Sequence, residues 1–184
     1  MTTTLRPLSL TDAPGLLGVI DRNRTYFRCY LSWLDSVTSL VDVQTFISDN
    51  IALAANGKAY FCPILDRQTP IGLVGFNRIN RIHQSGEISY WLDAAYHGQG
   101  IVTHACREII EYGWNQLNLH RIELLINTDN LASCAVANRL GFRLEGMHRG
   151  SFRMYDRYVD QFCYVLLESD WRALADDIPN VHPS

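Results

Sequence analysis

Hydrophobic and polar positions change their period near the middle of the chain. Residues 88–92 are mostly β-branched or aromatic, a composition typical of a short strand. From Ile101 onward, apolar or small residues recur at spacings of three and four, which predicts an amphipathic helix. That stripe consists of Val102, Cys106, Ile109, Gly113 and Leu117. Gly98 and Gly100 lie between the two patterns, so we expect a strand, a tight turn and a helix in succession.

The same patterns predict further elements along the chain. Strands are expected at residues 4–8, 60–66, 71–80, 87–92, 122–126, 142–149 and 158–167. Helices are expected after a cap at Thr11 or Asp12, in a second region that holds Tyr26, Phe27, Tyr30 and Trp33, at residues 43–56 with Phe46, Ile47 and Ile51 facing inward, at 101–117, and from the cap Asn130 to Gly141. A turn is expected at residues 68–70, a polar, aromatic loop at 150–157 and a frayed tail after Trp171. This order predicts a mixed α/β sheet with helices on its faces.

Length and composition favour one domain. The chain has 184 residues, of which 47% are hydrophobic, enough to bury a substantial core. A net charge of −3 gives no reason to expect nucleic-acid binding, which usually needs a basic surplus. We find no apolar run of membrane-spanning length and no signal-peptide pattern at residues 1–4, so no membrane association and a cytoplasmic location are expected.

The strand, turn and helix around Gly98 and Gly100 suit an anion. Glycines let a backbone approach a ligand closely, and a helix N-terminus presents free N–H groups and a partial positive charge. Ile101 and Val102 stand where a Walker A loop has its Lys and Ser or Thr, and Thr103 stands where a dinucleotide fingerprint has its third glycine. A phosphate loop of another kind and a simple tight connection both remain open at this point.

The loop His97-Gly98-Gln99-Gly100-Ile101-Val102 resembles the pyrophosphate loop of the GNAT N-acetyltransferases, Gln/Arg-x-x-Gly-x-Gly/Ala, although His97 and Val102 depart from it at both ends. Within that superfamily, the chain is similar to the branch that acetylates the N-termini of ribosomal proteins. Further similar phrases are Gly75-Phe76-Asn77-Arg78-Ile79, Glu87-Ile88-Ser89-Tyr90-Trp91-Leu92, Asp129-Asn130-Leu131-Ala132-Ser133, Asn138-Arg139-Leu140-Gly141-Phe142 and Glu145-Gly146. Several motifs in the same order make the resemblance specific over most of the chain.

The resemblance implies a mostly antiparallel, GNAT-like central sheet in a single domain at residues 1–172, followed by a C-terminal tail at 173–184. It also implies acetyl-CoA as co-substrate and direct attack by an amine in a ternary complex. The amine favoured by the resemblance is the N-terminal α-amine of a protein, perhaps a ribosomal one. Acetylation of a small amine such as a polyamine or an antibiotic stays open, and so does a non-catalytic module that binds or senses acetyl-CoA.

Glu87 is the candidate base, because it is the only carboxylate at residues 86–92 and begins the strand that leads to the phosphate loop. It can act directly or through a water, or it can be an ordinary solvated carboxylate; Asp93 is the alternative base, although it can instead shape the turn. Many GNAT enzymes place a tyrosine acid where this chain has Ala137. The ribosomal branch resembles this chain in having a serine three residues after the capping asparagine, here Ser133. Ser133 is therefore the candidate acid, unless its hydroxyl bonds its own backbone.

The resemblance also implies the residues that hold the cofactor. They are Tyr90, Trp91, Leu92, His97, Gly98, Gln99, Gly100, Ile101, Val102, Asn127 and Asn130. The backbone N–H groups around Tyr90 to Leu92 would stabilise the oxyanion. Asn130 has a second reading as a helix N-cap, and His97 a second reading as an exposed loop residue.

Aromatic residues provide the candidate acceptor site. Tyr26, Trp33 and Tyr155 are expected to wall the cleft that receives the amine, although aromatic clusters of this kind also occur in cores. His83, His104, His120, His148 and His182 show no metal-ligand spacing, and the five cysteines are scattered singly, so we expect no metal and buried thiols rather than disulfides. A homodimer through the amino-terminal helices or the last loop is a further expectation.

Overall fold

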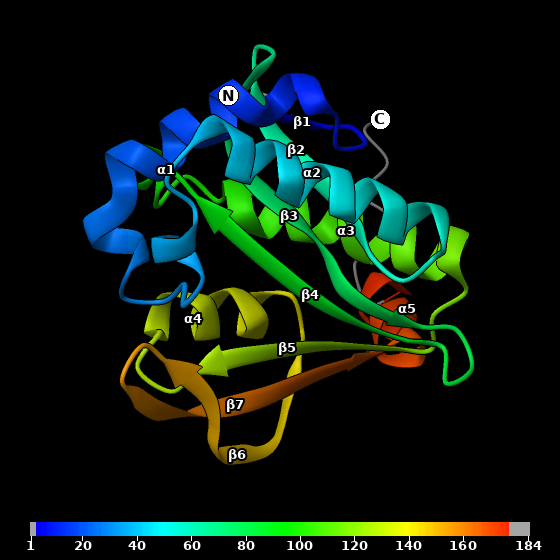
Figure 1. The fold of residues 1–184 in the computed structure, drawn as a ribbon. Coiled ribbons are helices and arrows are strands. Elements are labelled where there is room, and N and C mark those ends of the chain that lie inside the picture. Colours follow the sequence, from blue (N-terminus) through cyan, green and yellow to red (C-terminus); the bar gives the residue numbers. More distant parts are fainter. Residues whose placement is uncertain (1–2, 177–184) are drawn as a thin grey trace.

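The computed structural model describes residues 3–176, with side chains through residue 174. Seven strands form one sheet in the order β1-β2-β3-β4-β5-β7-β6, in which only the β4–β5 pair is parallel (Figure 1). The strands are β1 (Thr3–Leu5), β2 (Tyr60–Asp66), β3 (Thr69–Asn80), β4 (Ser85–Leu92), β5 (Arg121–Asn127), β6 (Arg143–Met154) and β7 (Arg157–Leu167). The α-helices are α1 (Ala13–Phe27), α2 (Leu40–Ala55), α3 (Ile101–Leu117), α4 (Leu131–Arg139) and α5 (Glu168–Asp176). The mixed, mostly antiparallel sheet of the sequence analysis is confirmed.

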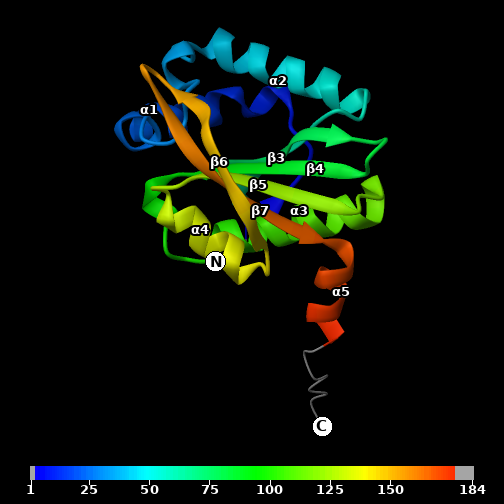
Figure 2. The same ribbon diagram turned by 90° about the horizontal axis from the view of Figure 1, so that it is seen from below.

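Helices cover both faces of the sheet, α1 and α2 on one and α3, α4 and α5 on the other (Figure 2). Each strand contributes side chains to the cores on both faces, because successive side chains along a strand point to opposite faces of the sheet. On β3, Leu73 packs in the core under α1 and α2, whereas the next residue, Val74, packs in the core that includes α3. Burial on both faces explains why β2 and β3 are apolar along most of their length.

Strands β4 and β5 pair over only a short stretch. Their register runs from Ser85 opposite Arg121 to Glu87 opposite Glu123 and then ends. Beyond that point β4 stays paired with β3 as far as Leu92, and β5 stays paired with β7 as far as Asn127. The two strands therefore separate in the middle of the sheet, and this separation positions the site described below.

The amino-terminal helices differ from the sequence prediction in two ways. Helix α1 runs on to Phe27, so Tyr26 and Phe27 end it, while Trp33 precedes a short 3-10 helix at Leu34–Ser36. The predicted second helical region was therefore wrong as one element. On α2, Ile47 is buried as predicted, but Phe46 and Ile51 are 36% and 42% exposed. The inward stripe is Val43 and Ile47, four residues and about one helical turn apart.

Two further boundaries differ toward the carboxyl end. Strand β6 continues to Met154 through an irregularity in its register with β7 between His148 and Phe152, and the chain turns at residues 155–156, so most of the predicted loop is strand. Helix α5 continues past Trp171 to Asp176, across the predicted limit of the domain at residue 172. The rest of the predicted tail, residues 177–184, lies outside the described residues.

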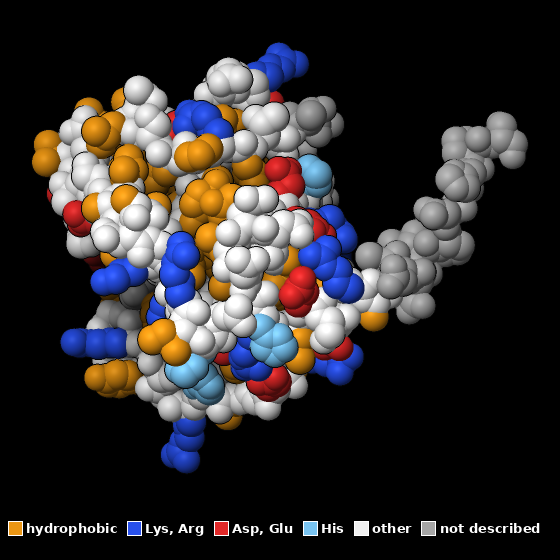
Figure 3. Space-filling view, turned by 90° about the vertical axis from the view of Figure 1, so that its right-hand side faces the viewer, with side chains coloured by type: hydrophobic (Ala, Val, Ile, Leu, Met, Phe, Trp, Pro, Cys, Tyr) orange, Lys and Arg blue, Asp and Glu red, His pale blue; other side chains and the backbone are white. Residues whose placement is uncertain are grey.

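Other local predictions are confirmed. Gly141 follows α4 with φ of 82°, and the amide of Phe142 donates to the carbonyl of Ala137 across it at 3.0 Å, which ends the helix as expected. Cys62, Cys106, Cys134 and Cys163 are buried thiols, whereas Cys29 is exposed. On the face seen in Figure 3, acidic and basic side chains intermingle without a large region of one sign. Within the described residues, no helix is both long and apolar enough to cross a bilayer.

Candidate active site

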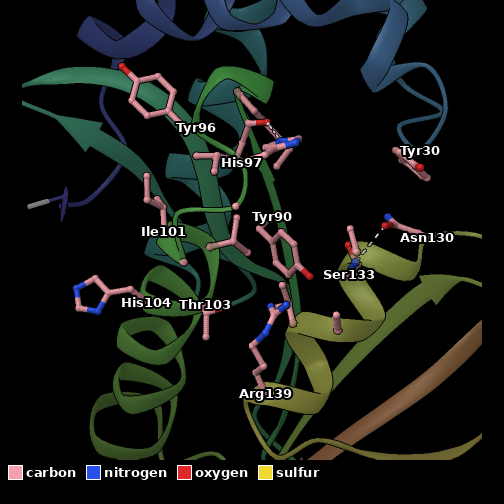
Figure 4. Close-up of a pocket in the computed structure, with 18 of the residues that line it drawn as sticks. Tyr30, Tyr90, Tyr96, His97, Ile101, Thr103, His104, Asn130, Ser133 and Arg139 are labelled. Atoms are coloured by element: carbon pink, nitrogen blue, oxygen red, sulfur yellow. Dashed lines mark hydrogen bonds between the residues drawn. The ribbon is translucent and has the colours of Figure 1, made fainter. Parts of the chain in front are cut away.

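A cavity of 720 Å³ lies where β4 leads into α3 and α4 faces α3. Its lining includes Tyr90, Leu92, Gly98, Gly100, Ile101, Val102, Thr103, His104, Arg107, Asn130, Ser133 and Arg139 (Figure 4). The strand, turn and helix predicted from the sequence therefore form one wall, and α4 supplies the opposite one.

Both glycines of the turn adopt the left-handed conformation that glycine tolerates best. Gly98 has φ of 75° and Gly100, the N-cap of α3, has φ of 74°. A Cβ added at either position would meet no atom within 4 Å, so the backbone faces open space. The first N–H groups of α3 are therefore accessible from the cavity, and the helix dipole favours an anion there.

Two arginines line the same cavity, and neither was among the predicted site residues. Arg107 lies one helical turn beyond Thr103 on α3, and Arg139 is in the last turn of α4. The sequence signal for the second arginine was the family-like phrase Asn138-Arg139-Leu140-Gly141-Phe142, which contains it. Main-chain N–H groups, a helix N-terminus and two guanidinium groups fit the phosphates of coenzyme A, and the apolar part of the lining fits its pantetheine arm.

His97 has another role from the one considered in the sequence analysis. Its Nε2 donates to the carbonyl of Leu92 at 3.1 Å, and its ring lies 5.1 Å from that of Tyr26. The imidazole therefore holds the turn against the end of β4 while it lines the cavity.

Asp93 ties the same turn to α1. It is 3% exposed and accepts hydrogen bonds from Arg22 at 2.6 Å and from Asn23 at 3.0 Å. Burial raises the pKa of Asp93, but these hydrogen bonds outweigh it and hold the pKa below its usual value. Since Asp93 lines neither cavity and is held by α1, it serves the turn and does not face the reacting groups.

A second cavity of 460 Å³ opens between the separated strands. It shares lining residues with the first, namely Tyr30, Leu31, Tyr90, Trp91, Asn130 and Ser133. The two cavities therefore meet beside β4 and the first turn of α4. A ligand in one can reach a ligand in the other at this junction.

Glu87 lies in the second cavity and is held in place from β3. A bulge between Phe76 and Arg78 lets Asn77 and Arg78 both reach it. Asn77 donates to one carboxylate oxygen at 3.3 Å, and Arg78 donates to the other at 3.1 Å. The Glu87 side chain is 20% exposed, so the carboxylate is fixed but remains open to a ligand.

Ser133 and Asn130 lie at the junction of the two cavities. The backbone amide of Ser133 donates to the side-chain oxygen of Asn130 at 3.1 Å, which caps α4 (Figure 4). The local bond of Ser133 is thus made by its amide, which leaves the hydroxyl for the cavities. Asn130 combines the capping role with a place in the cavity wall.

The remaining predicted residues are spread over several places. Tyr26 lines the first cavity, Trp33 lines the second, and Trp91 lines both. Asn127 lines the second cavity, where its side-chain oxygen accepts from Gln161 at 3.1 Å. Gln99 and Tyr155 line neither.

Tyr155 instead connects the β6–β7 turn to the segment after α1. Its hydroxyl donates to the carbonyl of Leu31 at 3.0 Å, and Arg28 lies over its ring at 4.8 Å. The sequence analysis missed Asn77, Ser89, Phe152 and Gln161 in the second cavity. They come from separate strands, so no spacing along the chain could have grouped them. Among the described residues, no group of three or more His, Cys, Asp or Glu side chains is placed to hold a metal.

A glycine turn at a helix N-terminus, beside strands that part where two cavities meet, suits an acyltransferase that uses a coenzyme A thioester. The model of the acetyltransferase (GNAT) domain matches residues 2–143. The chain therefore belongs to the GNAT acetyltransferase family and is an acetyl-CoA-dependent N-acetyltransferase.

Named relatives place it near the ribosomal branch. The chain is 33% identical over 150 residues to the ribosomal-protein-serine acetyltransferase of Escherichia coli K12, covering 82% of this chain and 84% of that one. A ribosomal L7/L12 α-N-protein acetyltransferase in complex with coenzyme A superposes with a TM-score of 0.87 at 28% identity, covering 91% and 94%. The microcin C7 self-immunity acetyltransferase MccE in complex with acetyl-CoA and AMP superposes with a TM-score of 0.85 at 31% identity, covering 90% and 92%.

Proposed function

We propose that the acceptor is the N-terminal α-amine of a protein, with ribosomal proteins as the first candidates. The observation that carries the proposal is the junction of the two cavities at Tyr90 and Ser133, with Glu87 in the second cavity at the last register pair of β4 and β5. It lets an amine in the second cavity meet a thioester in the first. The relatives named for ribosomal-protein acetylation support the same acceptor.

The lining of the second cavity favours a peptide over a small polycation. Glu87 is the one charged side chain among its described lining residues, which also include the amides Asn77, Asn127 and Gln161. Amide side chains pair with peptide N–H and C=O groups, whereas a polyamine or an aminoglycoside carries several positive charges that need several carboxylates. One carboxylate suits one amine.

In the proposed reaction, acetyl-CoA supplies an acetyl group activated as a thioester. Glu87 takes the proton of the amine, either directly or through a water, so that the nitrogen can attack the carbonyl carbon. An α-amine has a reference pKa of about 8 against about 10.4 for lysine, and thus needs only a modest base.

Two further groups assist this transfer in the proposal. The N–H groups of alternate β4 residues point away from β3, and beyond Glu87 they face the gap between β4 and β5. They would stabilise negative charge on the carbonyl oxygen of the thioester. Ser133 would donate to the sulfur as the C–S bond breaks.

Release of the coenzyme A thiol from acetyl-CoA tests the acceptor. The panel contains peptides with Ser, Ala or Met N-termini, a lysine peptide with a blocked N-terminus, spermidine and an aminoglycoside. Turnover with the free N-termini alone is the expected result. Turnover confined to the lysine peptide, spermidine or the aminoglycoside would overturn the proposed acceptor.

Replacing the base tests the role of Glu87. Glu87→Gln keeps the size of the side chain but cannot take a proton, so kcat should fall about 100-fold or more while acetyl-CoA affinity is retained. Glu123→Gln is the matched control, because Glu123 is the register partner of Glu87 on β5, is paired with Arg121 and lines neither cavity. Equal rates for both variants would contradict the assignment.

A further inference from the structure

One buried hydroxyl at the junction of the cavities has no partner. Among the described residues, only Tyr90 Oη and Trp114 Nε1 are buried side-chain polar atoms without a hydrogen bond. Trp114 lines neither cavity, whereas Tyr90 lines both. A buried polar group without a hydrogen bond costs free energy. A ligand that forms a hydrogen bond with the Tyr90 hydroxyl removes this cost and so gains binding free energy.

The surroundings of Tyr90 place its hydroxyl on the coenzyme side of β4. Its ring packs against the core that includes α3, and its hydroxyl points toward α4, between Ser133 and Arg139 (Figure 4). Burial raises the pKa of Tyr90, and the facing Ser133 hydroxyl only partly offsets this. The hydroxyl therefore keeps its proton at neutral pH and is available as a donor.

The ligand atom must accept a hydrogen bond and lie where the two cavities meet. The carbonyl oxygen of a thioester at this point is served by the main-chain N–H groups of β4, which face the gap toward β5. The side chain of Tyr90 leaves the strand toward α3 and α4 instead, on the side that holds the coenzyme. The remaining acceptor at the reacting centre is the sulfur.

We propose that Tyr90 is a catalytic residue whose hydroxyl donates a hydrogen bond to the departing sulfur of coenzyme A, beside Ser133. During transfer the N–C bond forms, the C–S bond breaks and its electron pair goes to the sulfur. The Tyr90 proton stays on its oxygen, because a thiol is the stronger acid. The proton of the amine goes to Glu87 or water, and the thiolate takes a proton from water. The proposal rests on acetyl transfer from a thioester and on no particular acceptor.

Tyr90→Phe removes the hydroxyl and keeps the ring. With a peptide acceptor that turns over, kcat should fall about 10- to 100-fold, as expected for a lost hydrogen bond to a charged atom, while the KM for acetyl-CoA stays within about twofold. Tyr164→Phe is the control, because Tyr164 is also buried but lines neither cavity. An unchanged kcat in Tyr90→Phe, or an equal fall in both variants, would overturn the proposal.

Ionisation of bound coenzyme A gives a second test that needs no acceptor. A donor to the sulfur stabilises the thiolate, so the pKa of the bound thiol, followed by thiolate ultraviolet absorbance, should rise by about one to two pH units in Tyr90→Phe. Desulfo-coenzyme A, which lacks the sulfur, should bind both proteins equally. The same thiol pKa in both proteins, or weaker desulfo-coenzyme A binding by the variant, would refute the role. Failure of every peptide to react would leave this test standing and count only against the proposed acceptor.

Discussion

Replacing Gly100 by alanine separates two consequences of the glycine turn before α3. At φ of 74° an alanine is strained, which costs about 1 to 2 kcal/mol of unfolding free energy. For a domain of this size that corresponds to a fall in Tm of about 2 to 8 °C. The new Cβ would meet no protein atom within 4 Å, so the fold should survive.

The same Cβ would occupy space at the wall of the coenzyme cavity. If it keeps a phosphate from one backbone amide, the lost hydrogen bond to a charged group costs about 1.5 to 3 kcal/mol, or roughly 10- to 100-fold in acetyl-CoA affinity. Isothermal titration calorimetry measures this affinity, and thermal unfolding measures the stability of the same sample.

Gly150 supplies the matched control for this experiment. It also has positive φ, 55°, and open space around a Cβ, but it lies on β6 and lines neither cavity. Gly150→Ala should lose similar stability and keep its acetyl-CoA affinity. Affinity within about twofold of the unmodified protein in Gly100→Ala would refute the phosphate-loop assignment, and so would equal losses of affinity in both variants.

Two more predictions concern the groups around this loop. Because its native pKa lies below the unfolded value, Asp93 stabilises the fold above about pH 4, and this contribution disappears as the pH falls through the native pKa. Asp93→Ala should therefore unfold about 3 kcal/mol more easily at pH 7, with a smaller difference at pH 3; a constant difference in urea unfolding between these pH values would contradict this. Arg139→Gln should weaken acetyl-CoA binding about tenfold and reduce its dependence on salt, as measured by calorimetry at two ionic strengths, whereas an unchanged salt dependence would exclude Arg139 as a phosphate contact.

The resemblance to a family and the local pattern together predicted much of the fold. Helix α3, the turn before it and the end of α4 at Gly141 were all found from sequence. These features depend on contacts between residues close in the chain, such as a glycine in the left-handed region or an apolar residue every three or four positions. Phe46 and Ile51 were misjudged because apolar residues flank the buried stripe of α2, so the pattern did not mark which face turns inward.

The site could be predicted only in part. Glu87 was named from its place at the start of a strand and Ser133 from the resemblance. The side chains that hold Glu87, Asn77 and Arg78, reach it through a bulge in β3 that has no sequence signature. The aromatic cluster was split, since Tyr26 lines one cavity and Trp33 the other, whereas Tyr155 lines neither and donates to the carbonyl of Leu31.

By itself the sequence determined the local parts of this protein: which segments are helix or strand, and where a glycine turn presents a helix N-terminus. Tertiary structure alone decided that β4 and β5 separate after Glu87, that two cavities meet there, and that the Tyr90 hydroxyl is buried between them without a partner. The physical reason is the range of the interactions. Backbone conformation and helix periodicity depend on near neighbours, whereas strand register and burial depend on residues far apart in the chain that only the folded sheet brings together.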